Sequence, residues 1–363
     1  MSRCRYVALL IVAFAIASSA QDSRHHQPKL TPQNSNTTQL LIAVSPVNER
    51  IVWASGAGGT FVVTTDGGRH WRSGVVPGTD ALEFRDVQGV SDKVAYLQSV
   101  GDNPTDFQIF KTVDGGKNWT LQFQNQLEGA FYDCFAFWTP WRGISHSDSV
   151  NGVFPDIRTE DGGRHWQDIS GNMPMALPGE FSFASSGTCV ATEGQENAWI
   201  ATGGAAVARI LATRDGGDTW NAYDTPLYSS SSAGAFTVAF RDSRHGIVGG
   251  GDLDPNDPDN ARTAVSDDGG QNWTLTNAPP VTGAIFGLAY TGDQDRGWGD
   301  RHNNHTVVIT ADTGGAAWTP DEGSTWVPLK NVTGFWGVAF ASPEAGWMVG
   351  ENGTILKVSF DGR

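Results

Sequence analysis

Four carboxylates in the middle of the chain have positions that could support chemistry. Asp133 and Glu180 lie beside aromatic residues, Asp148 follows His146-Ser147, and Asp252 follows three glycines. Carboxylates that converge repel one another, so such a group must share protons, hold a cation, or act as acid and base. All four are candidate ligand-binding residues. If the chain is an enzyme, Asp133 and Glu180 are its candidate catalytic pair.

A weaker pattern in the same region supplies oxygen ligands. Asp252, Asp254 and Asn256 alternate along the chain, with Asp257 and Asp259 close behind. This spacing is typical of a calcium loop, but the glycine and the distal glutamate of an EF-hand are missing. A solvated acidic loop is the alternative interpretation. Calcium is the one cofactor that the sequence suggests.

The elements that position these residues follow from an eight-residue motif, Ser/Thr-x-Asp-x-Gly-x-x-Trp. Asp accepts hydrogen bonds within its own turn, Gly supplies positive φ, and Trp covers the turn with apolar area. The motif recurs about every 50 residues, which is the period of one four-stranded propeller blade. Its aspartates are Asp66, Asp114, Asp161, Asp215, Asp268 and Asp321, and a seventh copy begins at Ser359.

Between these boxes, a second pattern marks three strands, A, B and C, and the box is the turn from C to D. Seven A strands predict an all-β, seven-bladed β-propeller of four-stranded antiparallel blades, in one domain over residues 21–363. The last blade lacks a D strand, because the chain ends inside its box. We expect residues 26–35 to pair with that open edge, so that both terminal segments close the ring.

The first position of each A strand is predicted to lie at the mouth of the central channel. Its occupants are Leu41, Phe84, Asp133, Thr188, Phe236, Phe286 and Trp336. Asp133 breaks this mainly apolar pattern, as functional residues often do. The alternative is that Asp133 only hydrogen-bonds loop backbone. The other three acids lie at D-to-A or B-to-C junctions, so we expect all four around one acidic pocket, opposite the boxes.

Two cysteines occupy equal positions in neighbouring A strands. Cys134 and Cys189 both stand second in their strands. Because equal positions point the same way around the ring, we expect two buried free thiols. A disulfide is the alternative for a pair in an exported protein.

The start of the chain and its charge bear on location and partners. Residues 1–20 show a basic start, an apolar run and a small-residue cleavage site ending at Ala20, which predict a signal peptide. We therefore expect a secreted product, periplasmic or extracellular, and a monomer. The net charge of −15 argues against nucleic acid and anionic membranes as partners.

The tandem units resemble Asp-box (BNR) β-propellers, and the last unit resembles the Ycf48-like photosystem II assembly factors and related sialidase-like bacterial proteins. In such propellers the boxes lie at the periphery, so the resemblance implies a structural role for the six box aspartates. The fold alone does not define a function, because it serves enzymes and scaffolds alike.

Two functions remain open. The resemblance favours a binding or assembly scaffold for a protein or glycan partner. The alternative is a glycan-active enzyme that uses two of the carboxylates, as glycoside hydrolases do. Sialidase activity is not expected, because the resemblance would require an Arg-Ile-Pro motif where this chain has Arg50-Ile51-Val52, and no arginine triad matches.

Overall fold

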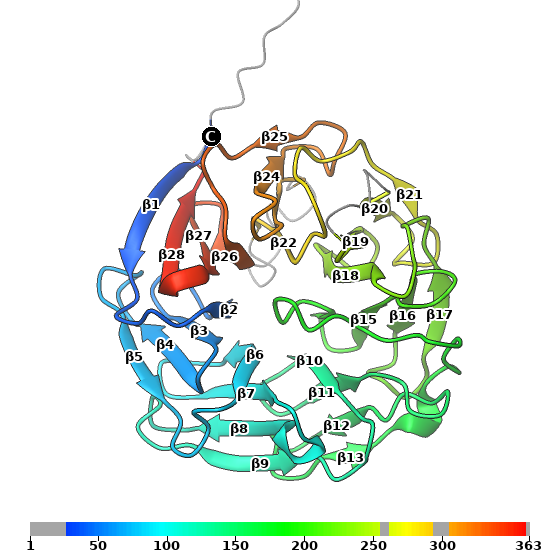
Figure 1. Ribbon diagram of the computed structural model, residues 1–363, viewed down its shortest axis with the longest axis horizontal. Coiled ribbons are helices and arrows are strands. Elements are labelled where there is room, and N and C mark those ends of the chain that lie inside the picture. The colour runs from blue at the N-terminus through cyan, green and yellow to red at the C-terminus, as the bar shows by residue number, and fades with distance from the viewer. Residues whose placement is uncertain (1–26, 255–260, 293–304, 361–363) are drawn as a thin grey trace, which may run out of the picture.

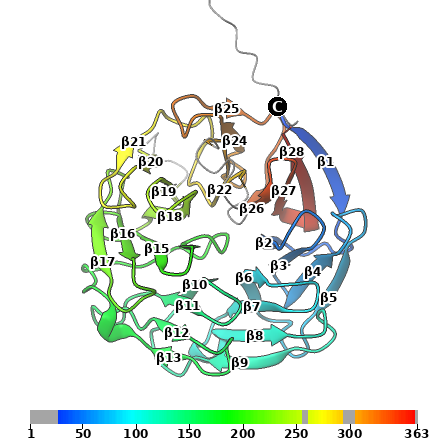
Figure 2. The same cartoon turned by 180° about the vertical axis from the view of Figure 1, so that it is seen from behind.

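The computed structural model describes residues 27–254, 261–292 and 305–360. Seven four-stranded antiparallel sheets stand around a ring, which Figure 1 shows along its axis and Figure 2 shows from behind. This confirms the predicted all-β, seven-bladed propeller. The predicted signal peptide lies outside the described residues.

Each blade runs from an inner strand A at the channel to an outer strand D at the rim. Blades one to three consist of β2 (Leu41–Pro46), β3 (Val52–Gly56), β4 (Thr60–Thr64) and β5 (Arg72–Val75); β6 (Glu83–Gly89), β7 (Ala95–Val100), β8 (Gln108–Thr112) and β9 (Thr120–Gln124); and β10 (Tyr132–Phe137), β11 (Gly143–Ser147), β12 (Ile157–Thr159) and β13 (Gln167–Asp168).

Blades four to six continue the same order. Their strands are β14 (Val190–Glu193), β15 (Asn197–Thr202), β16 (Arg209–Thr213) and β17 (Asn221–Asp224); β18 (Ala233–Phe240), β19 (Gly246–Asp252), β20 (Thr263–Ser266) and β21 (Thr274–Leu275); and β22 (Gly287–Tyr290), β23 (Val307–Thr310), β24 (Ala316–Thr319) and β25 (Val327–Pro328). Short 3-10 turns are η1 (Pro104–Asp106), η2 (Ser170–Asn172) and η4 (Glu351–Gly353).

The seventh blade joins the two ends of the chain. It contains β26 (Phe335–Ser342), β27 (Ala345–Gly350) and β28 (Thr354–Ser359), and its outer strand is β1 (Lys29–Asn34). β1 pairs antiparallel with β28, and both lie side by side in Figures 1 and 2. The predicted ring closure is confirmed, and it covers the outer edge of β28, which would otherwise be unpaired.

The Asp boxes form the C-to-D turns as predicted. In the first box, Thr64 Oγ1 donates to Asp66 and accepts the Gly68 N–H, while Asp66 accepts the His70 N–H at 3.0 Å. The other five boxes repeat these bonds. In the second box, hydrogen bonds from Asn118 lower the pKa of Asp114 to about 2. The box carboxylates are therefore occupied in holding their own turns.

Five of the inner strands (β2, β6, β10, β18 and β26) carry a bulge near the start, and this corrects one part of the predicted register. The bulge residue is Asp133 in β10 and Phe236 in β18, as expected. In blades one and two it is Ile42 and Arg85, one residue later than predicted. A bulge inserts one unpaired residue, so an alignment by side-chain alternation shifts by one position there. Arg85 is therefore the equivalent of Asp133 in the neighbouring blade.

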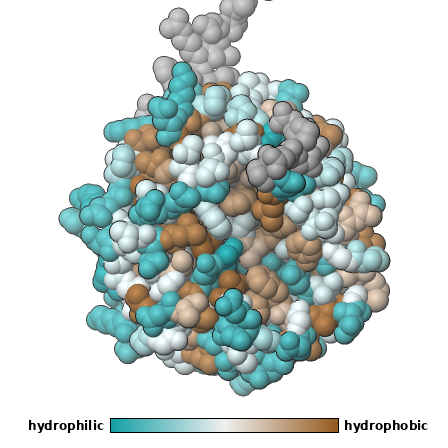
Figure 3. All heavy atoms as spheres, viewed as in Figure 1, coloured by the Kyte–Doolittle hydropathy of each residue, from teal (hydrophilic) through white to brown (hydrophobic). Residues whose placement is uncertain are grey.

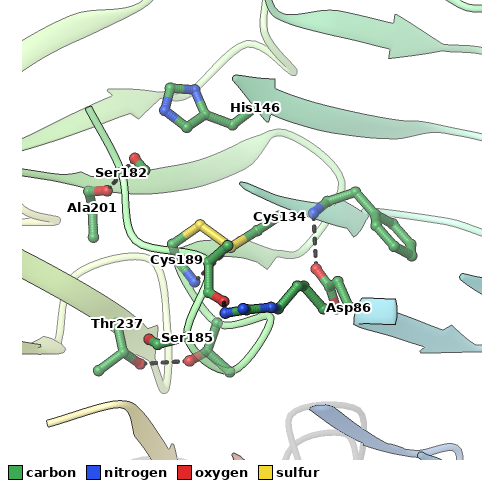
Figure 4. The surroundings of a disulfide bond; sticks show 12 residues. Asp86, Cys134, His146, Ser182, Ser185, Cys189, Ala201 and Thr237 are labelled. Atoms are coloured by element: carbon green, nitrogen blue, oxygen red, sulfur yellow. Dashed lines mark hydrogen bonds between the residues drawn. A yellow bond between two sulfur atoms is a disulfide. The ribbon is translucent and has the colours of Figure 1, made fainter. Parts of the chain in front are cut away.

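The prediction of free thiols is wrong: Cys134 and Cys189 form a disulfide, shown in Figure 4. Both residues are fully buried, and their Cα atoms are 6.0 Å apart, a separation that a disulfide spans. Equal position therefore does not keep the two sulfurs apart; Cys189 directly precedes β14, and its carbonyl accepts the Ala201 N–H of β15. Cys134 follows the β10 bulge, where the strand is also irregular.

A segment between blades three and four enters the channel, and we call residues 181–188 the plug segment. Ser185 and Ser186 donate their hydroxyls to the Phe286 carbonyl of blade six. Arg85 of blade two donates to the Ala184 carbonyl at 2.8 Å. Figure 4 shows Ser185 and Cys189 together with Asp86 of blade two and Thr237 of blade five. The plug segment thus spans the channel and closes it at one level.

Candidate functional site

The molecule has two chemically different ends. The acidic face is the end with the D-to-A and B-to-C connections, and the box face is the end with the A-to-B connections and the Asp boxes. Exposed or partly exposed acids of the acidic face are Asp80, Glu83, Asp102, Asp106, Glu128, Asp148, Asp168, Asp224, Asp252, Asp254, Asp312 and Glu351. Within the described ranges, only Arg85 and Lys330 expose a cation there.

Asp133 and Asp148 meet at the channel mouth on the acidic face. Asp133 is 1% exposed, and neither of its oxygens accepts a hydrogen bond from a donor in the described chain. Burial, and next the adjacent Asp148 carboxylate, raise the pKa of Asp133 well above its usual value. Burial raises the pKa of Asp148 to about 6, although the Ser182 N–H donates to Asp148 at 2.8 Å. The two carboxyl groups therefore share a proton near neutral pH.

A histidine and a third acid lie beneath this pair, and the sequence analysis did not assign them to the site. His146 Nδ1 is 2.9 Å from both oxygens of Asp156, and both side chains are fully buried. Asp156 also accepts the Ser147 N–H at 3.1 Å. His146 Nε2 has no hydrogen-bond partner in the described structure. In the sequence, this contact was indicated by His146, which stands close to Asp148 at the end of a B strand.

Glu180 is committed to an ion pair. Arg209 Nε donates to Glu180 Oε1 at 2.9 Å, and Arg209 Nη2 donates to Oε2 at 2.5 Å. Thr202 Oγ1 and the Leu177 N–H donate to the same carboxylate. The Glu180 side chain is fully buried, and that of Arg209 is 10% exposed. The Glu180 carboxylate oxygens are therefore already occupied by donors from blade four and from the loop before it.

Asp252 lies on the same face but interacts within blade five. Ser232 Oγ and the Asp254 N–H each donate to Asp252 Oδ1 at 2.8 Å. Asn256, the third predicted calcium ligand, lies outside the described residues. Among the described residues, no group of three His, Cys, Asp or Glu side chains could hold a metal ion. The calcium site stays a prediction.

The structure thus brings Asp133 and Asp148 together and leaves the other two acids in separate contacts. The backbone of Glu180 is close, because Ser149 Oγ donates to its carbonyl at 2.8 Å. Its side chain, however, turns to Arg209. Asp252 accepts hydrogen bonds from the serines of its own D-to-A loop and from the Asp254 N–H.

Aromatic side chains border the same mouth. Phe183 of the plug segment stacks on Phe236 with ring centroids 3.7 Å apart, and Phe286 contacts Trp336 at 5.0 Å. The Arg85 guanidinium lies 5.6 Å from the Trp336 ring. The mouth therefore combines a shared carboxylate pair with partly exposed aromatic surface. Figure 3 shows hydrophilic and hydrophobic residues interspersed over one side of the ring.

The shared proton predicts how stability depends on pH. A carboxyl group whose folded-state pKa is raised binds more protons when folded, so stability falls as pH rises from about 4 to above 6. We expect Asp148→Asn to remove the part of this loss that is due to Asp148 and to be more stable than wild type by about 2 kcal/mol at pH 8. Urea unfolding between pH 4 and 8 measures this difference in the free energy of unfolding, and the exposed Asp80→Asn is the control. A variant less stable than wild type at pH 8 would contradict the shared proton.

Comparisons with known proteins agree with the fold. The BNR/Asp-box repeat family matches residues 264–275, which contain the fifth box. The chain is an Asp-box (BNR-repeat) β-propeller, seven-bladed and closed by both terminal segments.

Within this class, the chain resembles Ycf48. It is 23% identical over 317 residues to the Photosystem II assembly protein Ycf48 of Synechococcus sp., which covers 84% of this chain and 80% of that protein. The solved structure of YCF48 bound to D1 peptide has a TM-score of 0.61 and 18% identity, covering 93% of this chain and 98% of that one. The GH74 enzyme of Niastella koreensis has a TM-score of 0.58 and 14% identity, covering 92% of this chain and 54% of that one.

One further finding concerns membranes. Over the residues that the structure describes, no helix is long and apolar enough to cross a bilayer.

Proposed function

We propose that this propeller is a binding or assembly scaffold that holds a cationic segment of a partner protein on its acidic face. The observation that carries the proposal is the Asp133–Asp148 pair at the channel mouth, where Asp133 is buried and has no hydrogen-bond partner in the described chain other than the carboxyl group with which it shares a proton. A buried carboxyl group of this kind is costly, and a cation or donor from a partner would reduce that cost. Arg85 from the next blade offsets the cost only in part.

Two further observations support binding over glycan cleavage. A glycosidase needs two carboxylates free to flank its substrate. Glu180, the predicted partner of Asp133, is instead bound to Arg209, Thr202 and a backbone N–H. In addition, the fold is similar to that of YCF48 bound to D1 peptide, so a peptide-binding role has a precedent in this architecture.

The surrounding charge favours a basic partner segment. Acids outnumber the two exposed cations of the acidic face, and a field of one sign attracts segments of the opposite sign. Partly exposed Phe286 and Trp336 supply apolar area and faces on which cationic side chains can lie. Export is part of the proposal: a disulfide such as Cys134–Cys189 forms in oxidising compartments outside the cytoplasm.

The test compares three labelled peptides of equal length, one rich in Lys and Arg, one neutral and one acidic, by fluorescence anisotropy. We expect the basic peptide alone to bind, more weakly at high salt. Asp133→Asn and Asp148→Asn should each weaken binding about tenfold, while thermal melting stays unchanged or rises. Glu344→Gln, at an exposed box-face position, is the matched control. Equal binding of all three peptides, or undiminished binding by Asp133→Asn, would refute the proposal.

A further inference from the structure

A second pocket lies on the other side of the plug segment. It is a cavity of about 540 Å³ inside the ring, and its inner end is lined by Ser186, Gly187 and Thr188. Its outer end is lined by residues of the A-to-B connections, so it opens toward the box face. Each inner strand contributes several lining residues, and among them every strand supplies a small or polar one: Ser45, Gln88, Ala136, Ala191, Ala239, Ala289 and Ala339. The channel is therefore a blind pocket whose wall contains a ring of small or polar side chains among larger ones.

Asp86 stands at the inner end of this pocket. It lines the cavity, is 4% exposed, and lies so close to Gly187 that a Cβ there would contact its carboxylate. The residues at the equivalent position in the other blades are uncharged: Ala43, Cys134, Cys189, Thr237, Gly287 and Gly337. Asp86 is thus the one acid among the seven residues at this level of the ring. The sequence alignment did not show this exception, because it placed blade two one residue out of register.

The hydrogen bonds of Asp86 leave part of its capacity unused. The Val87 N–H donates to Oδ1 at 2.7 Å and the Phe135 N–H donates to Oδ2 at 2.8 Å, a contact that Figure 4 shows. A carboxylate can accept about four hydrogen bonds. No Lys, Arg or His in the described ranges forms an ion pair with Asp86. Burial raises the pKa of Asp86 well above its usual value, so a cation that enters would stabilise the charged form.

The shape and the mouth of the pocket narrow the ligand class. Small wall residues leave room for a slim chain, and the volume lies within the range of small-molecule pockets. Glu49 and Glu193 lie among the lining residues on the box-face side. Carboxylates there favour the entry of cations over anions.

We propose that the blind channel binds a primary ammonium group on an unbranched aliphatic chain, with the ammonium donating to the Asp86 carboxylate. The chemistry is that of a lysine side chain on a protein or of a free alkylamine. This site lies below the plug segment and does not depend on the function proposed for the acidic face.

The experiment is a calorimetric titration of the full mature chain at pH 7 with pentylamine, with pentanol as the neutral probe of equal chain length. We expect pentylammonium to bind at least about tenfold more tightly than pentanol. Acetyl-Gly-Gly-Lys-Gly-Gly-amide separates the two sources: its binding identifies a lysine on a polypeptide, and binding of pentylamine alone identifies a free amine.

Two variants test the assignment to Asp86. Asp86→Asn should lower the affinity for pentylammonium about tenfold or more. Gln88→Lys, on the same face of β6, should do the same without changing Asp86, because its own ammonium competes for the carboxylate. Glu344→Gln, which removes an exposed carboxylate outside the cavity lining, is the matched control and should leave the affinity unchanged. Equal affinity for pentylammonium and pentanol, or undiminished binding by Gln88→Lys, would overturn the proposal.

Discussion

Glu180→Gln is expected to lower the free energy of unfolding by about 3–5 kcal/mol, because it leaves the Arg209 guanidinium buried without its counter-charge. Arg209 Nη2 would keep only its bond to the Met175 carbonyl among its present ionic and polar contacts with the loop. Guanidinium chloride unfolding of the two proteins measures the difference at one pH.

The control is a Glu–Arg ion pair whose side chains are partly exposed to solvent. Glu83 and Arg85 form an ion pair whose side chains are 38% and 25% exposed. Glu83→Gln should therefore cost less than about 1 kcal/mol. The double variant Glu180→Leu with Arg209→Met should recover much of the loss, since an apolar pair of similar size replaces a buried ion pair at little cost. Similar losses for Glu180→Gln and Glu83→Gln would contradict a structural role for the buried pair.

Removal of the disulfide is the second large effect. Replacing both Cys134 and Cys189 by Ala should lower the free energy of unfolding by about 4 kcal/mol, because the bridge closes a loop of 55 residues in the unfolded chain. It should also loosen the plug segment, which runs directly into Cys189. Thermal unfolding at fixed scan rate gives the size of the effect.

A thiol titration of the denatured chain from Gln21 onward, without reductant, is the accompanying measurement. We expect no free thiol in protein made under oxidising conditions, and two after reduction. Two free thiols before reduction, with a loss below about 1 kcal/mol in the double variant, would restore the original expectation of separate thiols.

The repeat made the fold predictable, because each Asp box is a local turn whose bonds involve residues within four positions, such as Thr64 and Gly68. The pairing of β1 with β28 was also predictable, since the last blade visibly lacked a strand. Contacts that depend on a bulge or a long loop were not. The register of Arg85 and Asp86, the bridge to Cys189 and the pairing of Glu180 with Arg209 all arise from irregular backbone.

The features of the candidate site also divide into those that the repeat made predictable and those that it did not. Asp133 was predictable as a violation of the repeat, and its meeting with Asp148 follows from the ends of adjacent strands A and B. The plug segment has no counterpart in the other units, so no internal alignment could place it. Its position separates the acidic mouth from the cavity at Asp86, where the sequence suggested a single pocket.

Amide hydrogen exchange with and without the bound basic peptide tests most directly whether the acidic face holds the partner segment. We expect slower exchange in the connection after β11 and in residues 177–186, where the Ser182 N–H bonds Asp148, with no change in the Asp-box turns. Protection confined to the Asp boxes or to the A-to-B connections, with residues 177–186 unchanged, would contradict this account.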